Sequence, residues 1–381
     1  MKKFFSNPAV RESLRIIIAI GSALLIGFII TLLVSEDPIG AYKAFLLGPL
    51  SKFNRFGDWI EESITLILVG LSVAVAFKAN LFSMGTQGQM ILGALVSGVV
   101  ALYVPLPALL RIPLALLGSI LTGFLWGWIP GYLKAYLNAN EIVSTLMLNT
   151  IALKIYDYFL IYKLKPADAG YNVSDYFPDE GCLKSFIPNL PFLSKIHEKF
   201  SNDTNITIMV YILVIAVIAA YYLIFKTPFG YKLRMIGSNE KFARYGGINT
   251  KKAIILIFAV SGIFGGLAGA HLSMGIHNRL ISNLSSNFAF EGIIVAILAR
   301  NNPLYIPIAG LAYGYLRAGA NVMERSSDIS REMIYIIQAI IILFVTAERL
   351  LPVIKRRISD RKANKLDPDR LEPSNGGTHE N

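Results

Sequence analysis

Long uninterrupted apolar stretches constrain this chain more than any other feature of its sequence. The clearest one runs from Ile206 to Phe225 and contains twenty residues without a charged side chain. At about 1.5 Å rise per residue, a helix of that length covers roughly 30 Å, the thickness of the hydrocarbon core of a bilayer. Such a stretch predicts a membrane-spanning helix.

The composition of the whole chain favours the same class of protein. Hydrophobic residues make up 54% of the 381 residues and charged residues 16%, whereas soluble domains carry about 25% charged residues. The apolar runs are continuous and do not alternate as barrel strands do, which excludes a transmembrane β-barrel. The net charge of +11 comes from Lys and Arg beside the apolar runs, where such residues set membrane topology. We therefore predict an all-α, polytopic helix bundle in the cell (inner or plasma) membrane that binds no nucleic acid.

About ten spans are predicted, with boundaries uncertain by several residues. The first is long enough to cross the membrane and has no small-residue cleavage site after it, so we interpret it as an uncleaved helix and not as a signal peptide. Residues 1–362 are predicted to form the membrane domain, and 363–381 a disordered cytoplasmic tail. The predicted spans are 14–34, 60–77, 88–104, 112–130, 142–161, 206–225, 253–274, 290–299 extended at its ends, 304–322 and 333–350.

Basic residues predict the orientation of these spans. Four Lys or Arg residues between Lys2 and Arg15 place the N-terminus in the cytoplasm. The loop 226–252 carries seven Lys or Arg residues against Glu240 alone, so we expect it inside as well. Ten crossings then place both termini in the cytoplasm and the loop 162–205 outside.

Two segments interrupt the hydrophobic pattern. In KANLFSMGTQGQ, residues 78–89, irregular backbone at membrane depth would have to pack within protein or line a wet cavity; the alternative is an ordinary cytoplasmic turn. ARNNP, residues 299–303, predicts a short polar turn with Arg300 as a cytoplasmic anchor. Within the span 253–274, Ser261, Gly265 and Gly269 recur every four residues, a spacing that predicts close packing against a neighbouring helix.

Polar residues inside the spans are the candidate pathway positions, because a charge at mid-helix costs roughly 2.5–3.5 kcal/mol. Glu141, Thr145 and Asn149 follow each other every four residues and share one helix face. Such residues either line a path for a polar solute or form interhelical hydrogen bonds that fix the packing. Gln338 in the last span has the same two interpretations. The candidate pathway residues are Asn80, Gln87, Gln89, Thr145, Asn149, Phe290 and Glu291.

The sequence contains no enzyme motif that we recognise. It lacks a Gly-x-x-x-x-Gly-Lys-Ser/Thr loop, a Gly-x-Ser-x-Gly elbow and a His-Glu-x-x-His pair. Cys182 is the single cysteine, and the four histidines lack metal-ligand spacing, so we interpret the histidines as incidental and expect no metal or cofactor. Few spans hold ionisable residues of the kind that ion-coupled transporters use. This scarcity favours a transporter driven by a partner.

Four segments, taken in order, resemble the permeases of bacterial ABC importers for nucleosides and simple sugars. They are GLSVAVAFKANLFSMGTQGQMILGA at 70–94, NEIVSTLMLN at 140–149, TPFGYKLRMIGSNEKFARYGGIN at 227–249 and EGIIVAILARNNPLYIPIAG at 291–310. The resemblance extends over roughly 60–350 and favours the nucleoside-type branch over the ribose-type branch. Lys78 and Asn80 depart from the small residues expected there, and the loop 162–205 is enlarged.

The resemblance implies a translocation subunit that works by alternating access and uses no ATP itself. Its implied partners are a separate ABC ATPase, a second permease chain in a heterodimer, and an extracellular or periplasmic solute-binding protein. The segment 227–249 would dock on the ATPase, although its charge alone is also explained as a topology signal. The implied coupling residues are Phe229, Gly230, Arg234, Gly237, Asn239, Ala243, Gly247 and Ile248.

Three alternatives remain open from the sequence. A ribose- or galactose-type sugar permease would share the same scaffold. A secondary transporter would work without an ATPase, and a membrane enzyme would need a site that the sequence does not reveal. Retention of a bound ATPase in detergent would separate the two permease interpretations from the other two.

Overall fold

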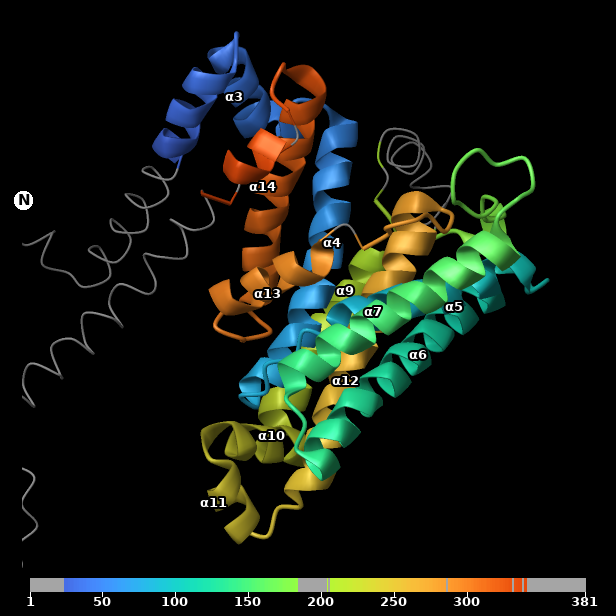
Figure 1. Ribbon diagram of the computed structural model, residues 1–381, viewed down its shortest axis with the longest axis vertical. Coiled ribbons are helices and arrows are strands. Elements are labelled where there is room, and N and C mark those ends of the chain that lie inside the picture. The colour runs from blue at the N-terminus through green and yellow to red at the C-terminus, as the bar shows by residue number, and fades with distance from the viewer. Residues whose placement is uncertain are drawn as a thin grey trace, which may run out of the picture. The chain divides into compact units, whose positions relative to one another are not determined.

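The computed structural model describes residues 24–183, 204, 206–285, 287–330, 332–337 and 339–340. The chain divides into two compact units, one formed by Phe45–Val322 and the other by Met1–Ala44 with Met323–Asn381. Within the described residues the regular elements are helices (Figure 1), apart from one isolated bridge between Val173 and Ile281. The all-α prediction is therefore confirmed for this part of the chain, whereas the predicted disordered tail at 363–381 lies outside it.

Among the residues that the structure describes, six long helices and several short ones lie wholly within the larger unit. Two helices are prolonged by π-helical turns, α7 over Leu160–Leu164 (η2) and α12 over Leu272–His277 (η4). The long helices are α4 (Phe53–Lys78), α5 (Thr86–Tyr103), α6 (Ala108–Leu137), α7 (Glu141–Phe159), α9 (Met209–Lys226) and α12 (Thr250–His271). The shorter elements are η1 (Gly48–Leu50), η3 (Asp179–Gly181), α10 (Pro228–Ser238), α11 (Glu240–Tyr245) and α13 (Phe288–Leu298). Two further helices, α3 (Pro38–Leu47) and α14 (Ile306–Ser326), contain the boundaries between the units.

Five of these helices are long and apolar enough to cross a membrane: α4, α5, α6, α9, and α12 together with η4. Two shorter apolar helices cover Leu24–Val34 and α13. These helices confirm the membrane class, but the number of ten crossings stays a prediction. Most of the predicted tenth span, 333–350, and Gln338 within it lie outside the described residues.

Helices α4 and α12 form the core of the larger unit. In the most apolar 18-residue stretch of each of these two helices, 83% is buried inside the protein. The corresponding share is 22% for α6 and for α9. The outer face of α6 carries exposed leucines such as Leu109, Leu117 and Leu125, side chains that lipid or a partner chain would cover. Long helices that are apolar all round and buried in this way are typical of membrane bundles.

The small residues of α12 explain how the core packs so closely. A Cβ on Gly265 would lie 2.7 Å from the Gln89 side chain of α5, and a Cβ on Gly269 would meet the Met90 backbone of the same helix. The predicted face of Ser261, Gly265 and Gly269 is thus confirmed as a packing face. Gly262 and Gly266 make a second such face, which the backbone of α6 approaches equally closely.

Side-chain caps start the helices at one end of the larger unit. Thr227 accepts a hydrogen bond from Gly230 N (3.1 Å) at the start of α10, with Pro228 in the first helical position. Asn239 and Asn249 likewise accept from Phe242 N and Lys252 N, each at 3.0 Å, at the starts of α11 and α12. Such caps satisfy N–H groups that have no partner within the helix. Within the basic loop 226–252, the caps at Thr227 and Asn239 mark the starts of two short helices, α10 and α11.

At the opposite end of this unit, the described part of the loop 162–205 packs on residues that follow α12. Ser174 N donates to Leu280 O (2.9 Å), and Phe177 N donates to Asn278 O (2.8 Å). Leu183 N donates to Met274 O (2.9 Å) within η4. These backbone bonds hold residues 172–183 against the end of α12.

The smaller unit joins its two segments by hydrogen bonds to Asp328. Ser35 Oγ donates to one carboxylate oxygen (2.6 Å) and Glu36 N to the other (2.7 Å). These bonds lower the pKa of the exposed Asp328 below its ordinary value. Tyr42 Oη also donates to Leu24 O (2.5 Å).

Candidate functional site

The chain is irregular between α4 and α5, and this interruption is partly buried. Helix α4 ends at Lys78 and α5 begins at Thr86. Ala79, Leu81 and Ser83 between them are buried. Asn80 is exposed and adopts a left-handed conformation with φ 57°. We call residues 79–85 the interhelical break; four of its seven residues are buried, whereas Asn80 and Phe82 are exposed.

Helix α7 holds the interhelical break through two of the predicted pathway residues. Thr145 Oγ1 accepts from Met84 N (3.2 Å), and Asn149 Oδ1 accepts from Gly88 N (2.9 Å) while its amide donates to Met84 O (2.8 Å). Both side chains are buried. They therefore provide the hydrogen bonds that irregular buried backbone needs, and a role in lining a solute path stays a prediction.

Helix α10 packs on the other side of the interhelical break. A Cβ on Gly237 would meet Lys78 O and would lie 3.0 Å from the Ala79 Cα. A Cβ on Gly230 would similarly meet the backbone of Leu223 and Ile224 at the end of α9. Only glycine fits at these two places, so α10 is seated directly on the ends of α4 and α9.

Arginine and lysine side chains surround the same junction. Arg234 donates to Ile224 O, and its guanidinium lies over the Phe225 ring at 5.7 Å. Lys78 Nζ lies 5.6 Å from the centre of the same ring. These contacts tie α10 to the last turn of α9. A movement of α10 would therefore be transmitted to α4 and α9 together.

The remaining predicted coupling residues support α11 or the turn after it. Ala243 is fully buried, Phe229 is half-buried, and Asn239 caps α11. Gly247 has φ +80°, a conformation that L-residues rarely adopt, and the half-buried Ile248 follows it. The structure thus gathers all eight predicted coupling residues around α10 and α11.

A polar cluster joins the middle of α4, α5 and α12. Ser72 Oγ lies 3.3 Å from Gln89 Oε1, 3.1 Å from Thr86 Oγ1 and 3.2 Å from Ser261 Oγ. Gln89 is 1% exposed, so this cluster has little access to solvent. Gln87 is more accessible and donates to Ser285 Oγ (3.2 Å).

Nearer the far end of α4, four buried residues form a cluster that we call the Glu61–His271 quartet. Glu61 Oε2 lies 2.5 Å from His271 Nε2, and Thr65 Oγ1 lies 2.9 Å from His271 Nδ1. Glu61 Oε1 accepts from Thr207 N (2.7 Å). Each of the four residues is at most 3% exposed. The quartet joins α4, α12 and the residues that lead into α9.

A second ionic cluster lies on the other side of α4 and includes one predicted pathway residue. Arg317 Nη1 donates to Glu291 Oε2 (2.5 Å), and Arg317 Nε lies 3.5 Å from Glu62 Oε2. The Arg317 guanidinium also lies over the Phe288 ring at 3.9 Å. The three charged side chains are 12–19% exposed. Phe290, also predicted for the pathway, is exposed beside this cluster on α13.

Sequence reasoning missed most of these ionic residues. His271 was interpreted as incidental, yet it pairs with a residue 210 positions away. Glu61, Glu62 and Arg317 were not singled out. Consecutive carboxylates within an otherwise apolar helix were the available signal, since unpaired charges there are costly. Among the described residues no group of three His, Cys, Asp or Glu residues could hold a metal ion.

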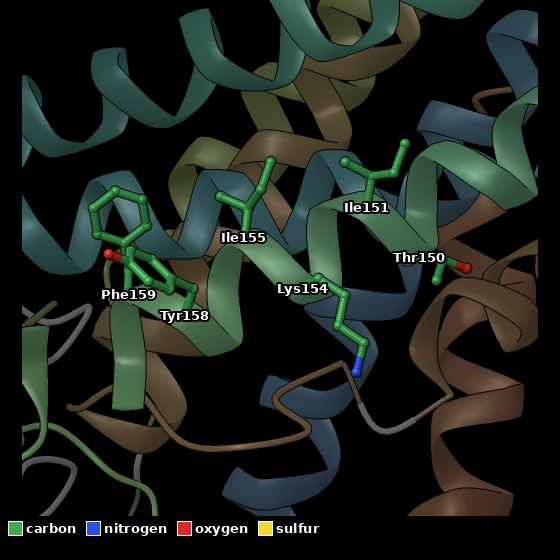
Figure 2. Close-up of a pocket in the computed structure, with 6 residues that line it drawn as sticks. All are labelled: Thr150, Ile151, Lys154, Ile155, Tyr158 and Phe159. Atoms are coloured by element: carbon green, nitrogen blue, oxygen red, sulfur yellow. The ribbon is translucent and has the colours of Figure 1, made fainter. Parts of the chain in front are cut away.

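Helix α7 carries a shallow groove on its exposed side (Figure 2), with a volume of about 370 Å³. Its lining is apolar or aromatic except for Thr150 and Lys154. Lys154 is exposed and forms no ion pair with any residue that the structure describes. Lys154 lies in the predicted span 142–161, where a charged side chain rarely faces lipid, so this side of α7 is a candidate for contact with another chain.

Comparison with known proteins decides the family. The family model described as "Branched-chain amino acid transport system / permease component" matches residues 56–346. This chain is an ABC transporter permease of that family. The matched region contains the interhelical break, α10, α11 and both ionic clusters. As a permease of this family, the chain is an integral membrane protein.

Relatives of this permease cover nearly its whole length. The nucleoside ABC transporter permease protein NupB of Lactococcus lactis is 30% identical over 94% of this chain and 97% of its own. The guanosine ABC transporter permease protein NupP of Bacillus subtilis is 30% identical over 91% and 97%. The glucose ABC transporter permease protein TsgB13 of Haloferax volcanii is 28% identical over 93% and 92%. No solved structure matches the chain.

Proposed function

We propose that this permease forms the path of an importer for nucleosides and that a separate ATPase drives it. The observation that carries the substrate class is the identity of 30% to two permeases named for nucleosides or guanosine, over more than nine-tenths of this chain. The path works by alternating access, and the permease itself takes part in no ATP chemistry and holds no cofactor. An external solute-binding protein supplies the affinity for the solute.

A sugar is the second candidate substrate, because TsgB13 is named as a glucose permease. Uptake into proteoliposomes that contain the permease chains, the ATPase and the binding protein distinguishes the two. We expect ATP-dependent uptake of radiolabelled guanosine or another nucleoside, and little uptake of glucose or ribose. The reverse preference would assign the chain to the sugar branch, and uptake that depends on an ion gradient in the absence of ATP would contradict the ABC mechanism.

The packing of α10 and α11 supports their role as the ATPase-coupling elements. Phe242 and Tyr245 are exposed on α11, 62% and 91% respectively, whereas Gly237 seats α10 on the interhelical break. We call the exposed side chains of Tyr231, Phe242 and Tyr245 the docking face. The ATPase binds the docking face, and its closure on ATP moves α10 against the ends of α4 and α9.

Membrane orientation follows from the same proposal. Ten crossings place both termini, α10 and α11 in the cytoplasm, and Cys182 outside. Because Cys182 is the single cysteine of the chain, a membrane-impermeant maleimide tests this orientation directly. The reagent is expected to label Cys182 in intact cells, and labelling only after permeabilisation would reverse the orientation.

A second permease chain completes the path as a heterodimer. Lys154 supports a partner on the exposed side of α7, because it lines the same groove as Ile151, Ile155 and Tyr158 and has no ion pair from the described residues. In Figure 2 its amino group points away from the two isoleucines. A carboxylate of the second chain would neutralise it. In a Cys182→Ser background, a cysteine at Ile151 is expected to cross-link to the second permease chain. Cross-linking to lipid-soluble probes alone would contradict this interface.

A further inference from the structure

A polar cavity lies where the end of α6 meets the proposed coupling helix α11 and the start of α12. Its volume is about 690 Å³. The ionisable side chains that line it are Lys134, Arg244, Lys251 and Glu240, and the turn of Gly247 and Ile248 closes one side. The proposed coupling movement of α11 would change the shape of this cavity.

The ionic balance of the cavity leaves one positive charge. Lys134 Nζ is paired with Glu141 Oε2 at 2.8 Å, so its charge is neutralised. Arg244 and Lys251 then face the cavity against Glu240 alone. The first N–H groups of α12, beside the Asn249 cap, add the positive end of a helix dipole. A ligand with a single negative charge matches this balance.

Aromatic residues place the cavity at the level of lipid headgroups. Trp128, Tyr132 and Tyr136 follow each other along the exposed side of α6, with ring centres 5.3 and 4.9 Å apart, and are 40–50% exposed. Tyr136 itself lines the cavity, and Lys251 Nζ lies 4.9 Å from the centre of its ring. Trp and Tyr gather at the boundary between the hydrocarbon core and water. The apolar surface of α6 continues from there toward Leu125 and Leu121, which are exposed.

We propose that this cavity binds the phosphate of an anionic phospholipid, with the acyl chains along the exposed side of α6. Arg244 and Lys251 bind the phosphodiester, and Tyr136 lies at the glycerol level. Basic cavities between membrane helices on the cytoplasmic side are suited to such headgroups. The cytoplasmic position rests on the orientation proposed above. Because Glu240 and Arg244 are on α11, the bound lipid would hold that helix against α6 and α12.

The test measures retention of single lipid molecules on the purified full permease complex by native mass spectrometry. Phosphatidylglycerol is titrated against a background of phosphatidylcholine. The double variant Arg244→Gln/Lys251→Gln is expected to weaken the tightest phosphatidylglycerol site about 30-fold, because each cation near the membrane surface contributes on the order of a factor of five. The matched control Lys241→Gln/Lys252→Gln removes two exposed charges of the same segment that do not line the cavity, and its tightest site is expected to change less than about threefold.

Further measurements distinguish an anionic phospholipid from the other possible occupants of the cavity. Glu240→Gln is expected to tighten the site about fivefold, a gain that a misfolded variant would not show. Displacement of the lipid by millimolar inorganic phosphate would identify a free anion as the ligand and overturn the proposal. Unchanged lipid retention with loss of the bound ATPase would identify the cavity as part of the docking face, and would also overturn it. Lipid retention does not depend on transport, so failure of nucleoside uptake would count against the proposed function and not against this site.

Discussion

The two ends of the larger unit are held together by different chemistry. At the end with α10, glycine makes the closest backbone contacts: Gly237 rests on the interhelical break and Gly230 on the end of α9, with Arg234 beside them. At the other end they meet through ionised or ionisable side chains, in the Glu61–His271 quartet and around Arg317. Steric backbone contacts transmit a displacement, whereas paired polar and charged side chains hold a fixed arrangement, and removal of one partner of a buried pair is costly. On this comparison we propose that the first end moves during transport and that the second end is an anchor.

The largest effect is expected at the anchoring end. Glu61→Ala removes the acceptor of Thr207 N and the partner of His271, and loss of one member of a buried pair typically costs about 3–5 kcal/mol. Thermal unfolding of the detergent-purified protein would measure the loss. Replacement of both partners, Glu61→Gln with His271→Gln, is expected to restore part of the stability, and equal unfolding temperatures for Glu61→Ala and the natural protein would refute the anchoring role.

A smaller loss of stability is expected at the second ionic cluster. Glu291→Gln weakens the contact with Arg317, but Arg317 keeps Glu62 and the Phe288 ring. Hydrogen bonds to charged groups contribute about 1.5–3 kcal/mol to the free energy of unfolding. Because this cluster is partly exposed, we expect a loss near the lower limit of that range. The same unfolding assay measures it. A loss as large as that of Glu61→Ala would show that the two clusters are equivalent anchors.

At the moving end, a substitution is expected to affect transport more than stability. Gly237→Val places a branched side chain against Lys78 O and Ala79, so α10 can no longer rest on the interhelical break. Uptake per molecule of folded complex is expected to fall about tenfold or more, equivalent to about 1.4 kcal/mol in coupling. Gly246→Ala is the matched control, because its Cβ would meet atoms no nearer than 3.5 Å. Equal uptake by both variants would remove Gly237 from the coupling path.

The smallest effect is expected on the docking face. Phe242 is 62% exposed and packs little within the chain, so Phe242→Ala leaves the unfolding temperature nearly unchanged. If the ATPase buries this side chain, the substitution weakens the binding free energy between permease and ATPase by about 1 kcal/mol or more. The affinity then falls about fivefold. Surface-bound permease titrated with the purified ATPase measures the change. Lys241 is exposed on the same helix, so the variant Lys241→Ala serves as the comparison.

The sequence predicted the moving end better than the anchoring end, for a physical reason. The four-residue spacing of Ser261, Gly265 and Gly269 is a local signal, and it correctly located the packing face of α12. The family resemblance singled out the segment 227–249, which contains α10 and α11. The Glu61–His271 quartet depends on residues from three distant segments, and a sequence does not show which of its charges will meet. For Thr145 and Asn149 the sequence left two roles open, and the structure supplies the interhelical hydrogen bonds. The ten crossings stay a prediction, because α7, α13 and α14 are not among the five helices long and apolar enough to cross and the first and tenth predicted spans lie partly outside the described residues.

The most direct test of the account places one cysteine on α11 and asks from which side of the membrane it reacts. In a Cys182→Ser background, Phe242→Cys is expected to resist an impermeant maleimide added to intact cells. It should react in inside-out vesicles that lack the ATPase, and become protected when the ATPase is added back. Labelling of intact cells would place α11 outside, where no cytoplasmic ATPase reaches it, and would contradict the proposed coupling.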